Sequence, residues 1–184
     1  MAAGLARHFV AMARNNAWAN HRLLSACDGL TPEEFAAPRT SFFPSLRATL
    51  NHILWVDTYY IDALERDPTV LERYGDPPPD FADAASLYDA QRASDRRLLA
   101  FCERQTEATL GDGLVLPRPD RTPPPSSVAS ILEHLFQHQI HHRGQAHAML
   151  AGTRVKPPQL DEFFLAGEAH LRRDELRALG LPEC

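Results

Sequence analysis

The chemistry that this sequence suggests lies in its histidines, five of which fall between His134 and His147. Within that segment His138 and His142 are four residues apart, and this spacing stacks two side chains on one face of an α-helix. Two imidazoles placed in this way can bind the same metal ion. The pair His134 and His138 has the same spacing, so the direction of each side chain has to decide between the two pairs.

The apolar residues of this segment predict which histidines face inward. Steps of three and four residues, typical of a helix face that packs against other helices, connect Val128, Ile131, Leu135, His138, His142, Gln145 and Met149. His142 falls near the middle of this face and His138 at its edge, whereas His134 and His141 are expected nearer to solvent. Because a buried imidazole without a partner costs free energy, polar residues that interrupt an apolar face together indicate a site.

A third ligand is expected from His52. Its helical neighbours form a largely apolar and aromatic stripe that predicts an inward direction: Ala48, Thr49, Trp55, Val56, Tyr59 and Ala63. A single inward histidine is more often a hydrogen-bonded core residue, so this prediction depends on the company of His138 and His142. Catalytic sites commonly have three protein ligands and an open position. Zinc, nickel or ferrous iron would accept three imidazoles, and the order of affinities alone does not choose among them.

Other polar residues near the histidines have expected roles as well. Gln145, one turn from His142, is predicted to orient a ligand or a bound water. Arg143 is expected on a different helix face, either in a surface or interface ion pair or binding an acidic group of the substrate. Glu133 points away from the inward face and Asp57 is not clearly aimed at the site, so neither is well placed as a general base.

Four long helices are expected to position these residues. Helical periodicity and capping residues predict helices from Gly4 to Ala26, from Ser45 to about Arg66, from about Asp83 to Gln105, and from Ser126 or Ser127 to near Gly152. Four long helices with connections of modest length describe an all-α four-helix bundle. The length suits a single domain spanning residues 1–184.

The segments between and after the long helices also contain patterns that predict local structure. Thr31, Pro32 and Glu34 form a capping-box pattern that opens a short helical turn. A loop is expected from Pro68 through Gly75 to the prolines 77–79. Residues 111–125, rich in glycine and proline, are expected to form an ordered excursion that could be a hairpin, with a strand-like patch at 114–116. A short extra C-terminal helix is predicted over residues 161–179.

Composition excludes several classes of function. The net charge is −5 and the basic residues are scattered, whereas proteins that bind nucleic acid usually show a basic patch. No apolar run is long enough to span a membrane. Cys27, Cys102 and Cys184 are too dispersed for a disulfide framework and suit reduced thiols, so we expect a protein of the cytoplasm.

The chain resembles the DinB/YfiT-like family of metal-dependent enzymes. The H-x-x-x-H-R-G-Q signature on the last bundle helix of that family is matched by His138, His142, Arg143, Gly144 and Gln145. A metal-binding histidine early in its second helix corresponds to His52. The first helix resembles the family's Y-N-x-W-A-N-x-R-L-L stretch through Asn16, Trp18, Ala19, Asn20, Arg22, Leu23 and Leu24. Asn15 replaces the tyrosine, and Gln137 stands where asparagine is common.

The resemblance implies a four-helix bundle, often a homodimer, with a divalent ion bound by three histidines. Some relatives are transferases or isomerases that use a low-molecular-weight thiol, and others are called hydrolases. We therefore expect an enzyme in which the ion activates a small thiol for transfer to an electrophilic small molecule, as in stress detoxification. Two alternatives stay open: metal-assisted hydrolysis, and a non-catalytic metal-binding or sensing dimer.

Overall fold

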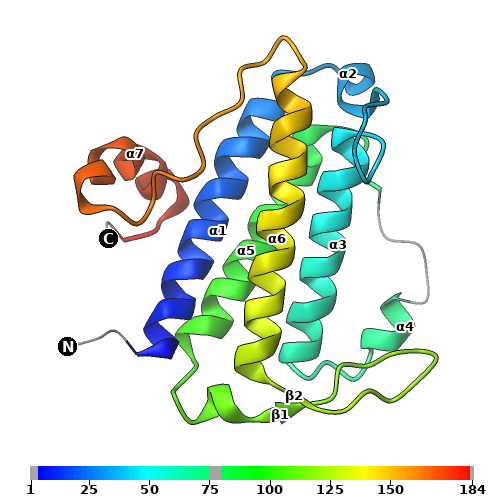
Figure 1. Cartoon of the computed structure of the whole chain (residues 1–184), viewed down its shortest axis with the longest axis vertical. Helices are drawn as coiled ribbons and strands as arrows, with labels where there is room; N and C mark the ends of the chain where they lie inside the picture. Colours follow the sequence, from blue (N-terminus) through cyan, green and yellow to red (C-terminus); the bar gives the residue numbers. More distant parts are fainter. Residues whose placement is uncertain (1–3, 75–79, 183–184) are drawn as a thin grey trace.

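A computed structural model describes residues 4–74 and 80–182, and four long helices dominate it (Figure 1). They are α1 (Leu5–Cys27), α3 (Leu46–Leu64), α5 (Ala84–Glu103) and α6 (Val128–Ala151). Around the bundle the order is α1, α5, α3, α6, and neighbours in this order pack against each other. The predicted all-α bundle is confirmed, with helix ends within a few residues of those expected. In the described ranges, no helix combines the length and hydropathy needed to cross a membrane.

Side-chain caps fix where three of the long helices begin. Ser45 accepts a hydrogen bond from the backbone N–H of Ala48 at 3.1 Å, which starts α3, and Asp83 caps α5 in the same way. Ser127 accepts from the backbone N–H of Ser130 at 3.1 Å and starts α6. Each cap satisfies a backbone donor that the helix leaves unpaired. The capping residues predicted for α3 and α6 are confirmed.

The connections contain short elements. These are α2 (Pro32–Ala36), α4 (Val70–Tyr74), the 3₁₀ turns η1 (Thr109–Gly111) and η2 (Ala166–Glu168), the strands β1 (Gly113–Leu114) and β2 (Ser126–Ser127), and α7 (Ala169–Leu179). The capping box that opens α2 is confirmed. The loop predicted from Pro68 was wrong in part, because α4 lies in it; residues 75–79 fall outside the described ranges.

The glycine- and proline-rich excursion is closed by a short antiparallel ladder. Leu114 of β1 lies opposite Ser126 of β2, which agrees with the hairpin considered for this segment. Residues 115–125 form no strand, so the predicted strand-like patch was wrong beyond Leu114. Five prolines in this stretch explain the difference, because proline cannot donate to a sheet ladder.

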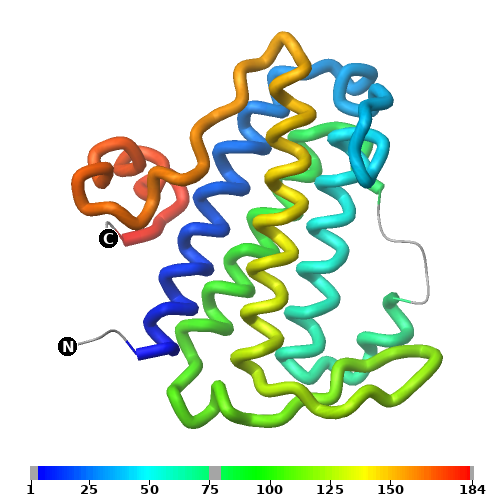
Figure 2. Tube along the Cα trace, viewed as in Figure 1, coloured from blue at the N-terminus to red at the C-terminus, as the bar shows by residue number. Residues whose placement is uncertain are grey.

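The C-terminal segment that contains η2 and α7 lies beside α1, outside the bundle (Figure 2). Helix α7 begins at Ala169 rather than at the predicted residue 161. The difference arises because Phe163 turns inward against Trp18, with ring centroids 5.5 Å apart. Arg22 stacks on Trp18 and pairs with Glu175 at 2.8 Å and Glu162 at 2.9 Å. The predicted extra C-terminal helix is therefore present and held on α1.

Two apolar clusters fill the bundle, and a layer of buried polar residues separates them. On α5, for example, Leu87 belongs to one cluster and Leu98 to the other, with Gln91 and Asp95 between them. The polar layer consists of Asn16, Asn20, Asp57, Gln91, Asp95, Gln139 and Arg143, which come from all four long helices. Such a layer needs internal hydrogen-bond partners, since burial without them is costly.

Candidate metal centre

Three histidines meet between α3 and α6. His52 comes from α3, and His138 and His142 lie one turn apart on α6. The Nε2 atoms of His52 and His138 are 3.1 Å apart, and one nitrogen from each of the three rings lies within 4.8 Å of the others. The structure thus brings together the three residues that the sequence singled out.

The spacing of these nitrogens fits a single ion. Zinc binds imidazole nitrogen at about 2.0–2.1 Å, so two ligands of a tetrahedral ion lie about 3.3 Å apart. The distance of 3.1 Å between His52 and His138 is close to that value. The three histidines could therefore hold one divalent ion after small side-chain movements.

The protonation state of the three histidines also suits the binding of a metal ion. Burial, and then the charge of neighbouring histidines, lowers the pKa of His138 to about 3 and that of His52 to about 4. Burial also lowers the pKa of His142, although its hydrogen bond to Gln145 acts in the opposite direction. All three rings are neutral at neutral pH, which is the form that binds a metal ion.

Gln145 is positioned to orient one of the three rings. Its Oε1 lies 2.9 Å from Nδ1 of His142, and its Nε2 lies 3.0 Å from Nε2 of His141. If Nδ1–H of His142 donates to this oxygen, Nε2 of His142 keeps its lone pair for an ion. Metal-binding histidines usually donate their second ring nitrogen to such a partner.

We predict that Gln145→Ala lowers the affinity for zinc about 10- to 100-fold, the range found when such an outer partner is lost. The ring of His142 would lose the acceptor that fixes its orientation. Competition with a zinc chelator measures this affinity. Gln145→Glu keeps an acceptor oxygen and should lose less; equal affinities in the alanine variant and the wild type would contradict the role given to Gln145.

Two phenylalanines that no pattern in the sequence predicted cover one side of the histidines. The ring centroid of Phe43 lies 4.3 Å from that of His52 and 5.5 Å from that of His142. Phe42 lies 6.2 Å from His142 and is 77% exposed. The signal in the sequence was an aromatic pair just before the Ser45 cap, but no helical periodicity places a residue of a connection.

The sequence matches one known family over most of its length. A sequence model of the DinB family matches residues 5–174, a range that contains all four long helices and the three histidines. The chain belongs to the DinB family. A comparison with curated proteins found no match.

The arginine of the family's H-R-G-Q motif lies in the polar layer of this DinB protein. Arg143 is 5% exposed, and its Nη1 donates to Oδ1 of Asn16 at 2.6 Å and of Asn20 at 2.9 Å. Both asparagines in turn donate to Asp95 at 3.0 Å. Of the two roles expected for Arg143, the surface or interface ion pair was wrong, and the binding of an acidic substrate group stays a prediction. Because α6 packs against α1 as well as α3, its buried arc is wider than the predicted face.

Asp57 belongs to the same layer. Gln91 Nε2 donates to Oδ2 of Asp57 at 2.8 Å and lies 3.2 Å from Oδ1 of Asp95. Burial is the main cause that raises the pKa of Asp57 to about 7 and that of Asp95 to about 6, with Arg143 acting against it. Burial also lowers the pKa of Arg143 to about 10, so its guanidinium stays charged at neutral pH.

We predict that Asp57→Asn becomes more stabilising, relative to the wild type, as the pH rises from 5 to 8. The folded protein raises the pKa of Asp57 to about 7 from an ordinary value of 3.8. The stability that the neutral carboxyl contributes is therefore complete below about pH 4 and is lost as the pH rises through about 7. Asparagine does not ionise and avoids this loss.

Urea unfolding at both pH values measures the difference, and Asp120→Asn at an exposed position is the matched control. A difference between wild type and Asp57→Asn that is the same at pH 5 and pH 8 would contradict the raised pKa.

A cavity of about 370 Å³ adjoins the histidines. We call it the aromatic cavity; it is lined by Trp55, Val56, Tyr59, Tyr60, Leu71, Tyr74, Pro117, Arg118, Pro119, His134 and His138. Its volume lies in the range of small-molecule sites, about 300–1,000 Å³. Since His138 is part of its wall, a molecule bound there would lie beside the candidate metal ligands.

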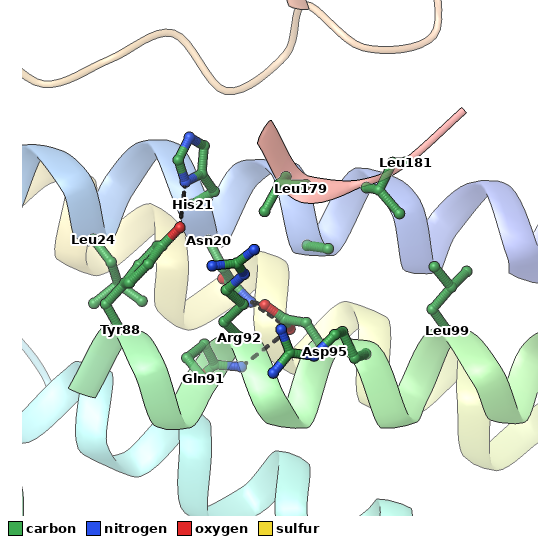
Figure 3. Close-up of a pocket in the computed structure, with 12 residues that line it drawn as sticks. Asn20, His21, Leu24, Tyr88, Gln91, Arg92, Asp95, Leu99, Leu179 and Leu181 are labelled. Atoms are coloured by element: carbon green, nitrogen blue, oxygen red, sulfur yellow. Dashed lines mark hydrogen bonds between the residues drawn. The ribbon is translucent and has the colours of Figure 1, made fainter. Parts of the chain in front are cut away.

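A second hollow, shown in Figure 3, lies between α1, α5 and the C-terminal segment. It measures about 20 Å³, which is room for one water molecule. Tyr88 and His21 close one side with a hydrogen bond of 2.7 Å, and Asp95 of the polar layer forms part of its wall. Its size excludes a substrate.

Proposed function

We propose that this DinB protein is a metal-dependent enzyme that activates a low-molecular-weight thiol and joins its sulfur to an electrophilic small molecule. The thiol would lose its proton to solvent, and its sulfur would displace a leaving group from a carbon of the electrophile. The observation that carries the proposal is the cluster of three neutral imidazoles, which in the described part of the chain includes no carboxylate and no cysteine. An ion bound by neutral ligands keeps its double positive charge, and such an ion holds a coordinated thiol in its deprotonated form.

The residues around the cluster support thiol transfer over hydrolysis. A thiolate needs no further base to attack an electrophile, whereas hydrolysis of an ester or amide needs a general base near the attacking water. Asp57, the buried carboxyl of α3, is bound by Gln91 inside the polar layer. The protein side of the reaction would then be His52, His138 and His142 as ligands, with Gln145 as the residue that orients His142.

An enzyme is also favoured over a purely structural or sensing site. Structural zinc sites are usually closed by four protein ligands, whereas catalytic sites keep an open position. The cluster offers three ligands in the described residues, and the wall of the aromatic cavity includes one of them, His138. This arrangement leaves space for a thiol and an electrophile to meet.

The test incubates metal-loaded protein with a panel of cellular thiols and 1-chloro-2,4-dinitrobenzene, and follows the coloured thioether. We expect turnover that disappears after chelation and in His142→Ala, and that persists in His8→Ala, a change at an exposed histidine of α1. No turnover with any thiol would count against the proposal. Metal-dependent cleavage of simple esters without thiol would favour a hydrolase, and a metal-induced gain in stability without chemistry would favour a sensing protein.

We further propose zinc, nickel or ferrous iron as the ion, and a homodimer in the cytoplasm as the assembly. The support is the imidazole ligand set and the resemblance described above. Elemental analysis of the purified protein identifies the ion, and light scattering measures the mass of the assembly.

A further inference from the structure

Aromatic rings that contact one another form much of the wall of the aromatic cavity. The ring centroid of Tyr59 lies 5.2 Å from that of Tyr60 and 5.1 Å from that of Tyr74, and both pairs meet nearly edge to face. Trp55 lies 5.8 Å from Tyr74 and 6.4 Å from His52, so it connects the cavity with the histidines. Aromatic walls of this kind favour a flat, aromatic guest, because rings prefer offset or edge-to-face contacts.

A single arginine gives this cavity its charge. The guanidinium of Arg118 lies 5.2 Å from the ring centroid of Tyr59, and it has no hydrogen-bond or ion-pair partner among residues 4–74 and 80–182. The hydroxyl of Tyr59 donates to the backbone oxygen of Pro117 at 2.5 Å, which holds the neighbouring residue of the loop in place. No aspartate or glutamate is among the described residues of the wall. The charge therefore favours an anionic guest.

The arginines of a neighbouring cavity can be compared with Arg118. It measures about 390 Å³ and shares Trp55 and Tyr74 with the aromatic cavity, but its charged residues are Arg73 and Arg97. Both of these arginines pair with Asp62 at 2.6 Å. Their charge is already matched within the protein, whereas that of Arg118 has no such match in the described residues. The anion site is therefore expected at Arg118.

We infer that the aromatic cavity binds an aromatic carboxylate, with its ring against Trp55, Tyr59 and Tyr74 and its carboxylate at Arg118. His138 belongs to the same wall, so the bound molecule would also lie near a candidate metal ligand. Arginine suits this partner because its planar fork matches a carboxylate. The inference rests on the proposed function only where it makes this molecule the electrophile. The molecule would then need, apart from its carboxylate, a carbon whose leaving group the thiolate displaces. The binding itself does not require the metal.

Calorimetric titration of metal-loaded protein with 2-naphthoate and with its neutral analogue 2-naphthamide tests the inference. We expect the carboxylate to bind about 10-fold more tightly than the amide, as a charge-assisted hydrogen bond provides. Arg118→Gln should abolish this preference while leaving the binding of the amide unchanged. Arg121→Gln, also at an exposed position of the loop but outside the cavity wall, should keep the preference.

The same titration of His142→Ala separates this inference from the proposed function. A carboxylate preference that survives in His142→Ala and disappears in Arg118→Gln supports the cavity, even if the thiol assay fails. A preference that disappears in His142→Ala and survives in Arg118→Gln would mean that the ion binds the carboxylate, and it would overturn the inference. Failure of both probes to bind the wild type would also overturn it.

Discussion

Replacing His142 with alanine is expected to lower the affinity for a divalent transition metal by more than about 100-fold, since losing even an outer partner costs about 10- to 100-fold. His142 is the most buried of the three candidate ligands, at 7% exposure, and its ring faces both His52 and His138. Two imidazoles would remain, too few for a typical protein site for zinc.

The measurement is the elemental content of untagged protein purified without chelators. We expect close to one equivalent of metal in the wild type and in the His8→Ala control, and almost none in His142→Ala or His138→Ala. If both site variants kept the metal content of the wild type, the ion would have to be bound elsewhere in the chain. If the wild type bound none of zinc, nickel or ferrous iron after titration, the histidines would serve packing.

Replacing Arg143 with methionine is expected to lower the free energy of unfolding by about 3–5 kcal/mol, the usual cost of removing one partner of a buried charged group. Methionine has a similar length but no charge, so the side-chain oxygens of Asn16 and Asn20 lose their donor. The carboxyls of Asp57 and Asp95 also lose the positive charge that acts on both.

Urea unfolding of the variant provides the measurement, and its pH dependence identifies the cause. The loss should be larger at pH 8 than at pH 5, because Asp57 and Asp95 ionise with pKa values of about 7 and 6 and then depend on Arg143. Adding Asp95→Asn to the methionine variant should recover part of the loss at pH 8. An equal loss at both pH values would show that packing, rather than charge, is what Arg143 contributes.

Periodicity predicted the helices and the inward direction of His52, His138 and His142, because those properties depend on spacing along one helix at a time. It failed for Arg143, since the width of a buried arc depends on how many other helices pack against it. Asn16 and Asn20 were recognised only as part of a family motif. The structure gives them a role, because they connect that motif on α1 to the arginine of the H-R-G-Q motif on α6.

The contribution of Phe43 could not be predicted for a different reason. It lies in the connection before α3, where no repeating pattern specifies direction, and its contact with His52 depends on the path of that connection. The aromatic cavity was also missed, because four separate segments form it. Long-range contacts of this kind leave little trace in local spacing.

His52 and His138 are 86 positions apart in the chain, yet their ring nitrogens lie side by side. Cys27 and Cys102 are free, so in the described residues no disulfide closes any loop of this protein. An ion held by the histidines would act as a cross-link between α3 and α6. In chain-entropy terms, a covalent bridge across a loop of this length restricts the unfolded chain by about 4–5 kcal/mol. The site would thus provide a reversible counterpart of a disulfide, and the resistance of the bundle to proteolysis would follow the metal supply of the cell.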